Sequence, residues 1–309
     1  MSSTELRNML LAAAGFGLAA LLPLADSGYF LSLGVGIVMY TVLATSWAMF
    51  SGPTHLISLA TAAFYGLGTY VVAVGIEQLP YPLLLLIALV AGAVTAGLVG
   101  LATLRLSGVY FVIFTLGLAE MIRQIVTWTQ NNWGGHRGLY VLTDLTERHI
   151  YWELLALAVL VYFVGWWINR SRLGFALRII GNDELVAAHC GISTARSKVL
   201  LFMISGAVAA VVGGLMAPRW TYIEPAIAFS PMLSFQVVIM ALLGGANRLW
   251  GPLVGVIPFT LLWEVISAEF PNQTMLLLGI AFLLIVYVIP QGVTGRIEAA
   301  VRALGTARV

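Results

Sequence analysis

Long apolar runs, separated by short connections rich in Gly, Pro or charged residues, make up most of this sequence. A run of roughly 20 apolar residues is long enough to cross a bilayer as a helix. The runs lack the period-two alternation that the lumen-facing side of a membrane β-barrel requires. The pattern therefore predicts an all-α polytopic membrane protein with about ten transmembrane helices, over Met9–Leu24, Phe30–Phe50, Phe64–Ile76, Pro82–Leu104, Val109–Trp128, Trp152–Ile168, Val199–Ala217, Leu233–Gly244, Pro252–Ser267 and Met275–Ile289.

The composition supports this interpretation. Of 309 residues, 61% are hydrophobic and 9% are charged, whereas soluble domains carry roughly 25% charged residues. The mean hydropathy is +0.98. Residues 1–309 are predicted to form a single transmembrane domain, with no room for a large soluble domain. The net charge of +2 argues against a nucleic-acid partner, and the lone Cys190 excludes an internal disulfide.

The first run is expected to be a retained span, because no small-x-small cleavage site precedes Asp26. Cytoplasmic loops retain Lys and Arg. An N-terminus inside puts eleven of the fifteen basic residues inside, and only Arg137, Arg148 and Arg219 in outer loops. Both termini are therefore predicted to be cytoplasmic. The eleven are Arg7, Arg105, Arg170, Arg172, Arg178, Arg196, Lys198, Arg248, Arg296, Arg302 and Arg308.

One inner loop, Asn169–Lys198, is long enough for two short helices. We expect Gly174 to open the first helix, Asn182 or Asp183 to cap the second, and Gly191 to end it. The loop carries apolar residues that include Phe175, Leu185 and Val186. Such an amphipathic element either packs back under the bundle or docks on another protein.

Few ionisable groups lie within the predicted spans. Glu120 and Arg123 are three residues apart on one helix, where they can form a pair. The pair is either a polar lining for a zwitterionic solute or a lock between two helices. Glu264 is close enough to the outer end of its span to reach the interface.

Glycine and proline mark two candidate interrupted spans, a feature that is frequent along transport pathways. In Ser51–Tyr70 the polar lining would come from Ser58, Thr61 and Tyr65. The second candidate is Leu243–Pro258, where a gate or hinge would lie at Gly244, Gly245, Gly251 and Pro252. The series Gly92, Ala96, Gly100 and Gly206, Ala210, Gly214 instead indicate close helix packing.

Nothing in the sequence indicates catalysis or a metal site. The four histidines are scattered and form no HExxH motif, and the only lysine, Lys198, is not part of a P-loop. This chain is therefore not expected to be an enzyme or to bind ATP in that manner.

Several segments resemble permease subunits of ABC importers for branched-chain amino acids, the LivM type. The stretch Arg172–Ile192 is similar to the family's cytoplasmic coupling loop, and Leu104–Arg123 to the run into its Glu-x-x-Arg helix. Its outer Gly-Gly-x-x-Gly-Leu loop corresponds to Gly134–Leu139, its Gly-rich turn to Leu243–Pro252, and its closing motif to Pro290–Gly292. The sequence departs from the family at Ala60, Thr61, His136, Arg137, Ile289 and Gln291.

The resemblance implies the fold and the partners of an ATP-driven importer. Two ATP-binding subunits would carry ATP and Mg, a second homologous permease chain would form a heterodimer, and a periplasmic or extracellular binding protein would deliver the solute. The complex would lie in a bacterial or archaeal plasma (inner) membrane as a multi-pass assembly. The ATPases would contact the loop through Phe175, Arg178, Asp183, Glu184, Ala187, Ala188 and Gly191.

In this interpretation the substrate pathway includes Ser58, Thr61, Tyr65, Tyr110, Thr115, Glu120 and Arg123. Two alternatives remain open. One is the same class of permease with another cargo, such as urea, a short amide or an aromatic amino acid. The other is an autonomous secondary transporter or channel, which the few membrane-embedded carboxylates and the long inner loop make a poorer fit.

Overall fold

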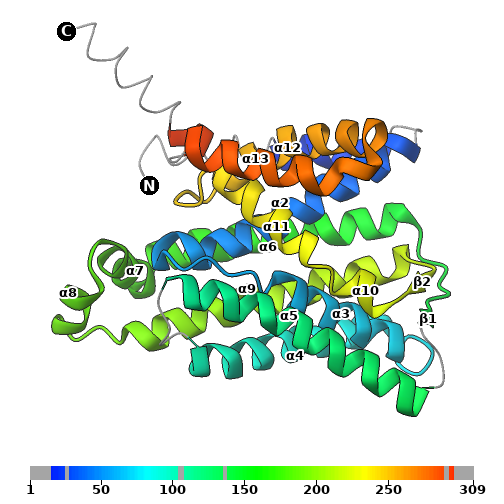
Figure 1. The fold of residues 1–309 in the computed structure, drawn as a ribbon, viewed down its shortest axis with the longest axis horizontal. Coiled ribbons are helices and arrows are strands. Elements are labelled where there is room, and N and C mark those ends of the chain that lie inside the picture. Colours follow the sequence, from blue (N-terminus) through cyan, green and yellow to red (C-terminus); the bar gives the residue numbers. More distant parts are fainter. Residues whose placement is uncertain (1–14, 25–27, 104–107, 135–137, 289–291, 296–309) are drawn as a thin grey trace, which may run out of the picture.

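The computed structural model describes residues 15–24, 28–103, 108–134, 138–288 and 292–295. Long helices dominate and run side by side along the long axis of the molecule (Figure 1). The helical elements are η1 (Leu22–Leu24), α2 (Gly28–Thr54), α3 (Thr61–Gly75), α4 (Tyr81–Thr103), α5 (Val109–Thr129), η2 (Gln130–Gly134), α6 (Glu147–Arg170), α7 (Arg172–Asn182), α8 (Glu184–His189), α9 (Thr194–Met216), η3 (Ala217–Arg219), α10 (Pro225–Ala228), α11 (Pro231–Gly244), α12 (Gly251–Glu269), η4 (Pro271–Gln273) and α13 (Thr274–Val288).

Within the described ranges, seven helical segments are long and apolar enough to cross a membrane. Two further apolar helical segments, Thr61–Gly75 and Pro271–Ile285, are shorter. The prediction of an all-α polytopic membrane protein is confirmed at this level. Several predicted features lie outside the described residues, namely Arg7, the start of the first run, Asp26, Arg105, His136, Arg137, Ile289, Pro290, Gln291, Arg296, Arg302 and Arg308.

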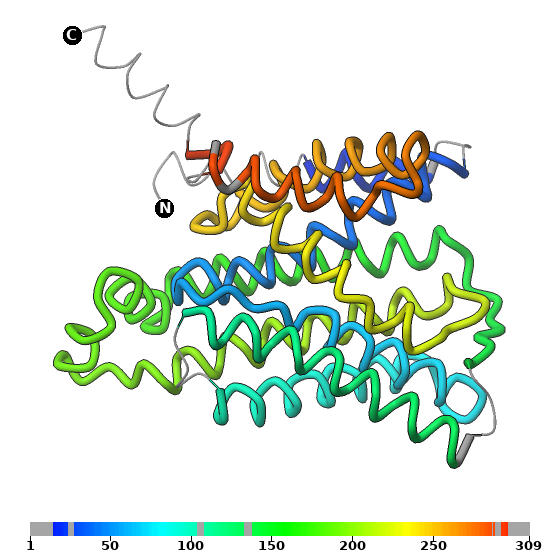
Figure 2. Tube along the Cα trace, viewed as in Figure 1, coloured from blue at the N-terminus to red at the C-terminus, as the bar shows by residue number. Residues whose placement is uncertain are grey.

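The two ends of the bundle differ. At one end α7 and α8 project beyond the neighbouring helices, and the connection between α11 and α12 lies toward the same end (Figure 2). At the other end lies a two-stranded antiparallel sheet of β1 (Leu139–Tyr140) and β2 (Tyr222–Ile223), in which Leu139 pairs with Ile223. The basic residues of the Arg170–Lys198 region therefore gather at the end opposite the sheet.

Helix α9 is the centre of the packing, with contacts to α4, α3 and α2. Small residues permit this, as the glycine and alanine repeat predicted. A Cβ on Gly92 would lie 2.5 Å from Cβ of Ala210, and one on Gly206 would lie 2.5 Å from Cβ of Ala96. On the α3 side, a Cβ on Gly68 would lie 1.8 Å from the carbonyl oxygen of Ala210. The three backbones thus approach as closely as glycine allows.

The second candidate for an interrupted span is a turn between two helices, so that expectation was wrong. Helix α11 ends at Gly244 and α12 begins at Gly251. A Cβ on Gly244 would lie 1.9 Å from the Gly251 oxygen, and one on Gly255 would lie 2.1 Å from the Met240 oxygen. The glycines are needed because the two helices leave the turn in backbone contact. Pro252 occupies the first turn of α12, where a proline costs no hydrogen bond.

The Gly68 contact predicts a large effect of one methyl group. Gly68→Ala places that group against a backbone oxygen that cannot rotate away, so α3 and α9 must separate. We expect a loss of roughly 1–3 kcal/mol or more in stability, measured as a lower thermal unfolding temperature in detergent. Gly117→Ala on α5, where no atom lies within 4 Å of the new Cβ, is the matched control and should not be destabilised. Equal unfolding temperatures for the two variants would contradict the packing.

Candidate functional site

The chain leaves the helical conformation between α2 and α3. Residues 55–60 are non-helical, and α3, which follows, has 15 residues. A helix of that length covers only about 22 Å at 1.5 Å per residue, whereas the hydrocarbon core is about 30 Å thick. The extended segment and α3 together therefore have the length that one interrupted span requires. This is the interruption predicted in Ser51–Tyr70.

Side chains from three helices satisfy the backbone of this interruption. Trp47 Nε1 of α2 donates to the Ser58 oxygen at 2.7 Å. The Leu59 nitrogen donates to Thr115 Oγ1 of α5 at 3.0 Å. Ser234 Oγ of α11 donates to the Leu59 oxygen at 2.8 Å and accepts from the Ala62 nitrogen at 2.9 Å. Irregular backbone is tolerated at membrane depth only when it is buried in protein and hydrogen-bonded in this way.

His55 joins the interruption to the projecting helices. Its Nε2 lies 3.0 Å from the carbonyl oxygen of Gly181 in α7. Its φ is +55°, the only positive value at a non-glycine residue in the described part of the chain. Such a backbone costs on the order of 1 kcal/mol or more, and it persists where surrounding contacts fix it. The first residue of the interruption is thus held by α7.

The two loop helices have the capping that the sequence predicts, with one shift. Asp183 caps α8, since its Oδ1 accepts from the Leu185 and Val186 nitrogens at 2.8 and 3.2 Å. Gly191 follows α8 with φ +78°. Gly174 does not open α7, because Ser171 occupies the N-cap and its Oγ accepts from the Gly174 nitrogen. A serine hydroxyl can bind a free N–H of the first turn and glycine cannot.

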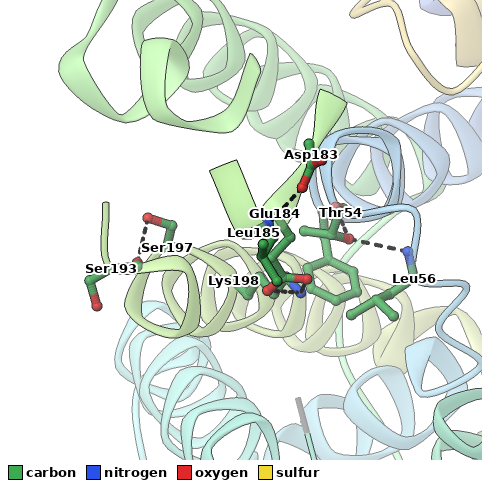
Figure 3. A network of polar contacts seen from close by, with 9 residues as sticks. Thr54, Leu56, Asp183, Glu184, Leu185, Ser193, Ser197 and Lys198 are labelled. Carbon is green, nitrogen blue, oxygen red and sulfur yellow. Dashed lines mark hydrogen bonds and ion pairs between the residues drawn. The ribbon is translucent and has the colours of Figure 1, made fainter. Parts of the chain in front are cut away.

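An ion pair fixes α8 to the start of α9. Lys198 Nζ lies 2.7 Å from Glu184 Oε1, and the lysine side chain is only 7% exposed. Figure 3 shows the two side chains pointing toward one another across the turn between α8 and α9. Sequence reasoning missed this pair, although its signal was present, since the chain's only lysine follows Glu184 by one helix and a turn. A buried lysine usually has an acidic partner.

The loop helices are amphipathic and present one face outward. Leu177, Ile180 and Ala187 are buried against the bundle, whereas Phe175 is 67% and Leu185 is 69% exposed. Ala187 was expected to contact a partner, but its side chain is buried and packs α8 against the bundle. Arg178, Asp183, Glu184, Ala188 and Gly191 are exposed.

The seven pathway candidates do not form one cluster. Tyr65 lines a cavity of about 540 Å³ between α2, α3 and α11. Ser58, Thr61 and Thr115 are buried at the interruption, and Tyr110 is 74% exposed at the start of α5. Thr115 lies beside the interruption and supports its backbone.

Glu120 and Arg123 pair with each other on α5, away from the cavity. Arg123 Nε donates to Glu120 Oε2 at 2.9 Å, and Gln124 Nε2 donates to Glu120 Oε1 at 2.9 Å. The Glu120 side chain is 45% exposed and the Arg123 side chain is 31% exposed. These contacts stay within one helix, so they do not lock two helices of this chain together.

Among His, Cys, Asp and Glu residues in the described ranges, no group of three or more could hold a metal ion. A bundle of apolar helices with an interrupted span and an amphipathic helix pair at one end is typical of a helical membrane transport protein.

The comparisons with known proteins identify the family. Residues 29–289 match the family described as "Branched-chain amino acid transport system / permease component", and the chain belongs to it. It is 27% identical to the high-affinity branched-chain amino acid transport system permease protein LivM of Escherichia coli, over 82% of this chain and 67% of that protein. No solved structure matches it at a significant level.

Two further relatives agree. The chain is 26% identical to the permease protein LivH of Escherichia coli and 24% identical to BraD of Pseudomonas aeruginosa, in each case over 84% of this chain and 92% of the relative. Both are named as high-affinity branched-chain amino acid transport system permease proteins. The resemblance that the sequence motifs indicated is confirmed, and this chain is a multi-pass membrane permease subunit.

The position of His55 generates a two-variant test. His55→Ala removes the contact to Gly181 and keeps a side chain at φ +55°, whereas His55→Gly removes both the contact and the strain. We expect faster amide hydrogen exchange in α7 in both variants, because its last turn loses an anchor. The glycine variant should be about 1 kcal/mol more stable than the alanine variant. Unchanged exchange in α7 would show that His55 does not hold this helix.

Proposed function

We propose that this chain is a membrane subunit of an ATP-driven importer that moves branched-chain amino acids into the cytoplasm. Three of its relatives are named as permease proteins of high-affinity branched-chain amino acid transport systems, and the family match covers residues 29–289. In this proposal residues 1–309 form one permease domain in a plasma (inner) membrane. The chain itself hydrolyses nothing, and ATP and Mg bind to partner subunits.

The main support for this proposal is the helix pair α7–α8, which we interpret as the docking element for an ATP-binding subunit. A docking element must be rigid, since nucleotide closure on the partner has to move the membrane helices between two states. The helix pair packs on the bundle through the buried residues Leu177, Ile180 and Ala187. The Glu184–Lys198 ion pair in addition holds α8 to α9. Phe175, Leu185 and Val186 then remain as an exposed apolar face.

The proposal includes ten spans and both termini in the cytoplasm. Seven helices are long enough alone, and the interruption plus α3 makes an eighth span. The remaining two would be the first apolar run and the 15-residue α13. With basic residues concentrated at the α7–α8 end, the positive-inside rule puts that end in the cytoplasm.

The partners follow from this class of importer. Two ATP-binding subunits would dock on the permease pair, one on each α7–α8 element. The second permease chain would be a homologue of this one, as LivM and LivH are both permease proteins named for branched-chain amino acid transport in Escherichia coli. A binding protein would deliver the solute at the end that carries β1 and β2.

Cysteine labelling tests the orientation. Cys190 is the only cysteine and is exposed after α8. An impermeant maleimide applied outside intact cells should spare it and should label it once the membrane is permeabilised. In a Cys190→Ser chain, Asp144→Cys in the exposed connection after β1 should be labelled from outside. Labelling of Cys190 in intact cells would reverse the orientation.

Ala187→Pro tests the docking element. The Ala187 nitrogen donates to the Asp183 oxygen at 3.1 Å, and a proline removes this bond and clashes with the preceding turn, at a local cost of about 3 kcal/mol or more. Because α8 lies beyond the spanning helices, membrane expression should stay near normal. We expect loss of ATPase co-purification and of solute-stimulated ATP hydrolysis.

Two variants of exposed residues complete this test. Leu185→Gln makes the exposed apolar face more polar and leaves the buried contacts of α7–α8 with the bundle intact, so it should weaken ATPase co-purification. Cys190→Ser, at an exposed position that is not among the expected contacts, should have no effect. Normal ATP-coupled uptake by Ala187→Pro would leave α7–α8 as packing only and would remove the main support for the proposed mechanism.

A further inference from the structure

A cavity of about 540 Å³ lies in the half of the bundle that faces the sheet, between α2, α3, α11, α12 and the connection after α9. Pockets that bind small molecules are typically about 300–1,000 Å³. Neither the family match nor the relatives' names assign a role to it. Its lining combines apolar walls with a few polar groups, which is the usual character of a small-molecule site.

The walls suit a branched or thioether side chain. Met39, Met216 and Met232 come from α2, α9 and α11, and Leu233 and Ile227 also line the cavity. Methionine side chains adapt to apolar groups of different shape. Four aromatic residues, Tyr40, Tyr65, Trp220 and Trp263, complete the lining.

Two residues of the cavity lining, Tyr40 and Gln236, are hydrogen-bonded to each other. Tyr40 Oη of α2 donates to Gln236 Oε1 of α11 at 2.5 Å, and Gln236 is 4% exposed. The Gln236 amide has in addition an NH₂ group that can donate, and the tyrosine hydroxyl oxygen can accept. A buried amide in the middle of an apolar helix is costly unless it is hydrogen-bonded. Gln236 therefore fixes the spacing of α2 and α11 and offers polar groups beside the methionines.

The only charged group in the described lining is a guanidinium. Arg219 lines the cavity, and its Nε lies 3.3 Å from Glu147 Oε1 while Nη2 donates to Ser32 Oγ. These contacts use two of the five N–H donors of arginine. The rest of the planar group can bind a carboxylate.

We propose that this cavity is a solute-binding station of the permease, and that its ligand is an α-amino acid with an apolar side chain. Arg219 binds the carboxylate, the methionines surround the side chain, and the tyrosine hydroxyl oxygens accept hydrogen bonds from the ammonium group. The proposal rests on the proposed function and adds to it a site within this chain.

The station borders the interruption. Tyr65 lies in the first turns of α3, just after residues 55–60, and Ser234 supports the interruption two residues before Gln236. A ligand between Tyr65 and Gln236 therefore contacts α3, which follows the interruption, and α11, whose Ser234 is hydrogen-bonded to it. His55, at its other end, contacts α7.

Filling the cavity tests the proposal. A Cβ on Gly36 of α2 meets no atom within 4 Å, and Gly36 lines the cavity, so Gly36→Leu occupies its volume without a backbone clash. Gly117→Leu on α5 is the matched control, since its Cβ is equally free and it lines none of the cavity. In proteoliposomes with the full complex, we expect at least tenfold slower leucine uptake for Gly36→Leu, with unchanged ATPase co-purification. The control should transport normally.

A protection experiment reads the site directly. In a Cys190→Ser chain carrying Ala226→Cys, which lines the cavity, leucine should slow modification by a small methanethiosulfonate reagent. Leucinamide, which lacks the carboxylate, should protect at least tenfold less well, and Arg219→Gln should abolish that difference between the two solutes.

The outcomes separate the two proposals. Normal uptake by Gly36→Leu, or no protection by leucine in a complex that transports leucine, overturns the station and leaves the proposed function standing. Absence of ATP-coupled leucine uptake by the unmodified complex overturns the proposed function, and with it the amino acid as the ligand. Equal protection by leucine and leucinamide overturns the role of Arg219.

Discussion

The close approach of α9 to α3 and α4 is the constraint on which the rest of this structure depends. Helices in a bilayer gain little from hydrophobic burial against each other, so they associate through packing at short backbone distance. Gly68, Gly92 and Gly206 provide that distance. With α3 pressed on α9 along its length, the preceding residues 55–60 have to bridge to α2 without a helix. The interruption is thus a consequence of where the small residues put α3.

Several polar side chains within the bundle form hydrogen bonds to backbone groups of the interruption. Thr115, Ser234 and Trp47 each bond to a main-chain group of the interruption. In a chain with 9% charged residues, a hydroxyl within a span is readily interpreted as pathway lining. Thr115 shows why that inference is weak, because a non-helical segment at membrane depth needs such partners whether or not a solute passes.

The sequence predicts those features that depend on local patterns. Apolar runs located the helices, and Asp183 and Gly191 marked the limits of α8, because capping depends on residues close in sequence. The Tyr40–Gln236 contact joins residues 196 positions apart, and no local pattern announces it. The glycines around Gly244 were misinterpreted since an interrupted span and a tight helical turn have the same composition.

The contacts around the interruption form a continuous mechanical connection. His55 fixes its beginning to α7, Ser234 fixes its end to α11, and α3 carries Tyr65 to the cavity immediately afterward. An extended segment bonded at both ends transmits displacement because its length is fixed, whereas a flexible loop absorbs it. Since Lys198 also fixes α8 to α9, a partner that moves α7–α8 acts on two helices that pack against each other. A displacement of α7–α8 therefore reaches the cavity through the extended segment and through the His55 and Ser234 contacts that hold its two ends.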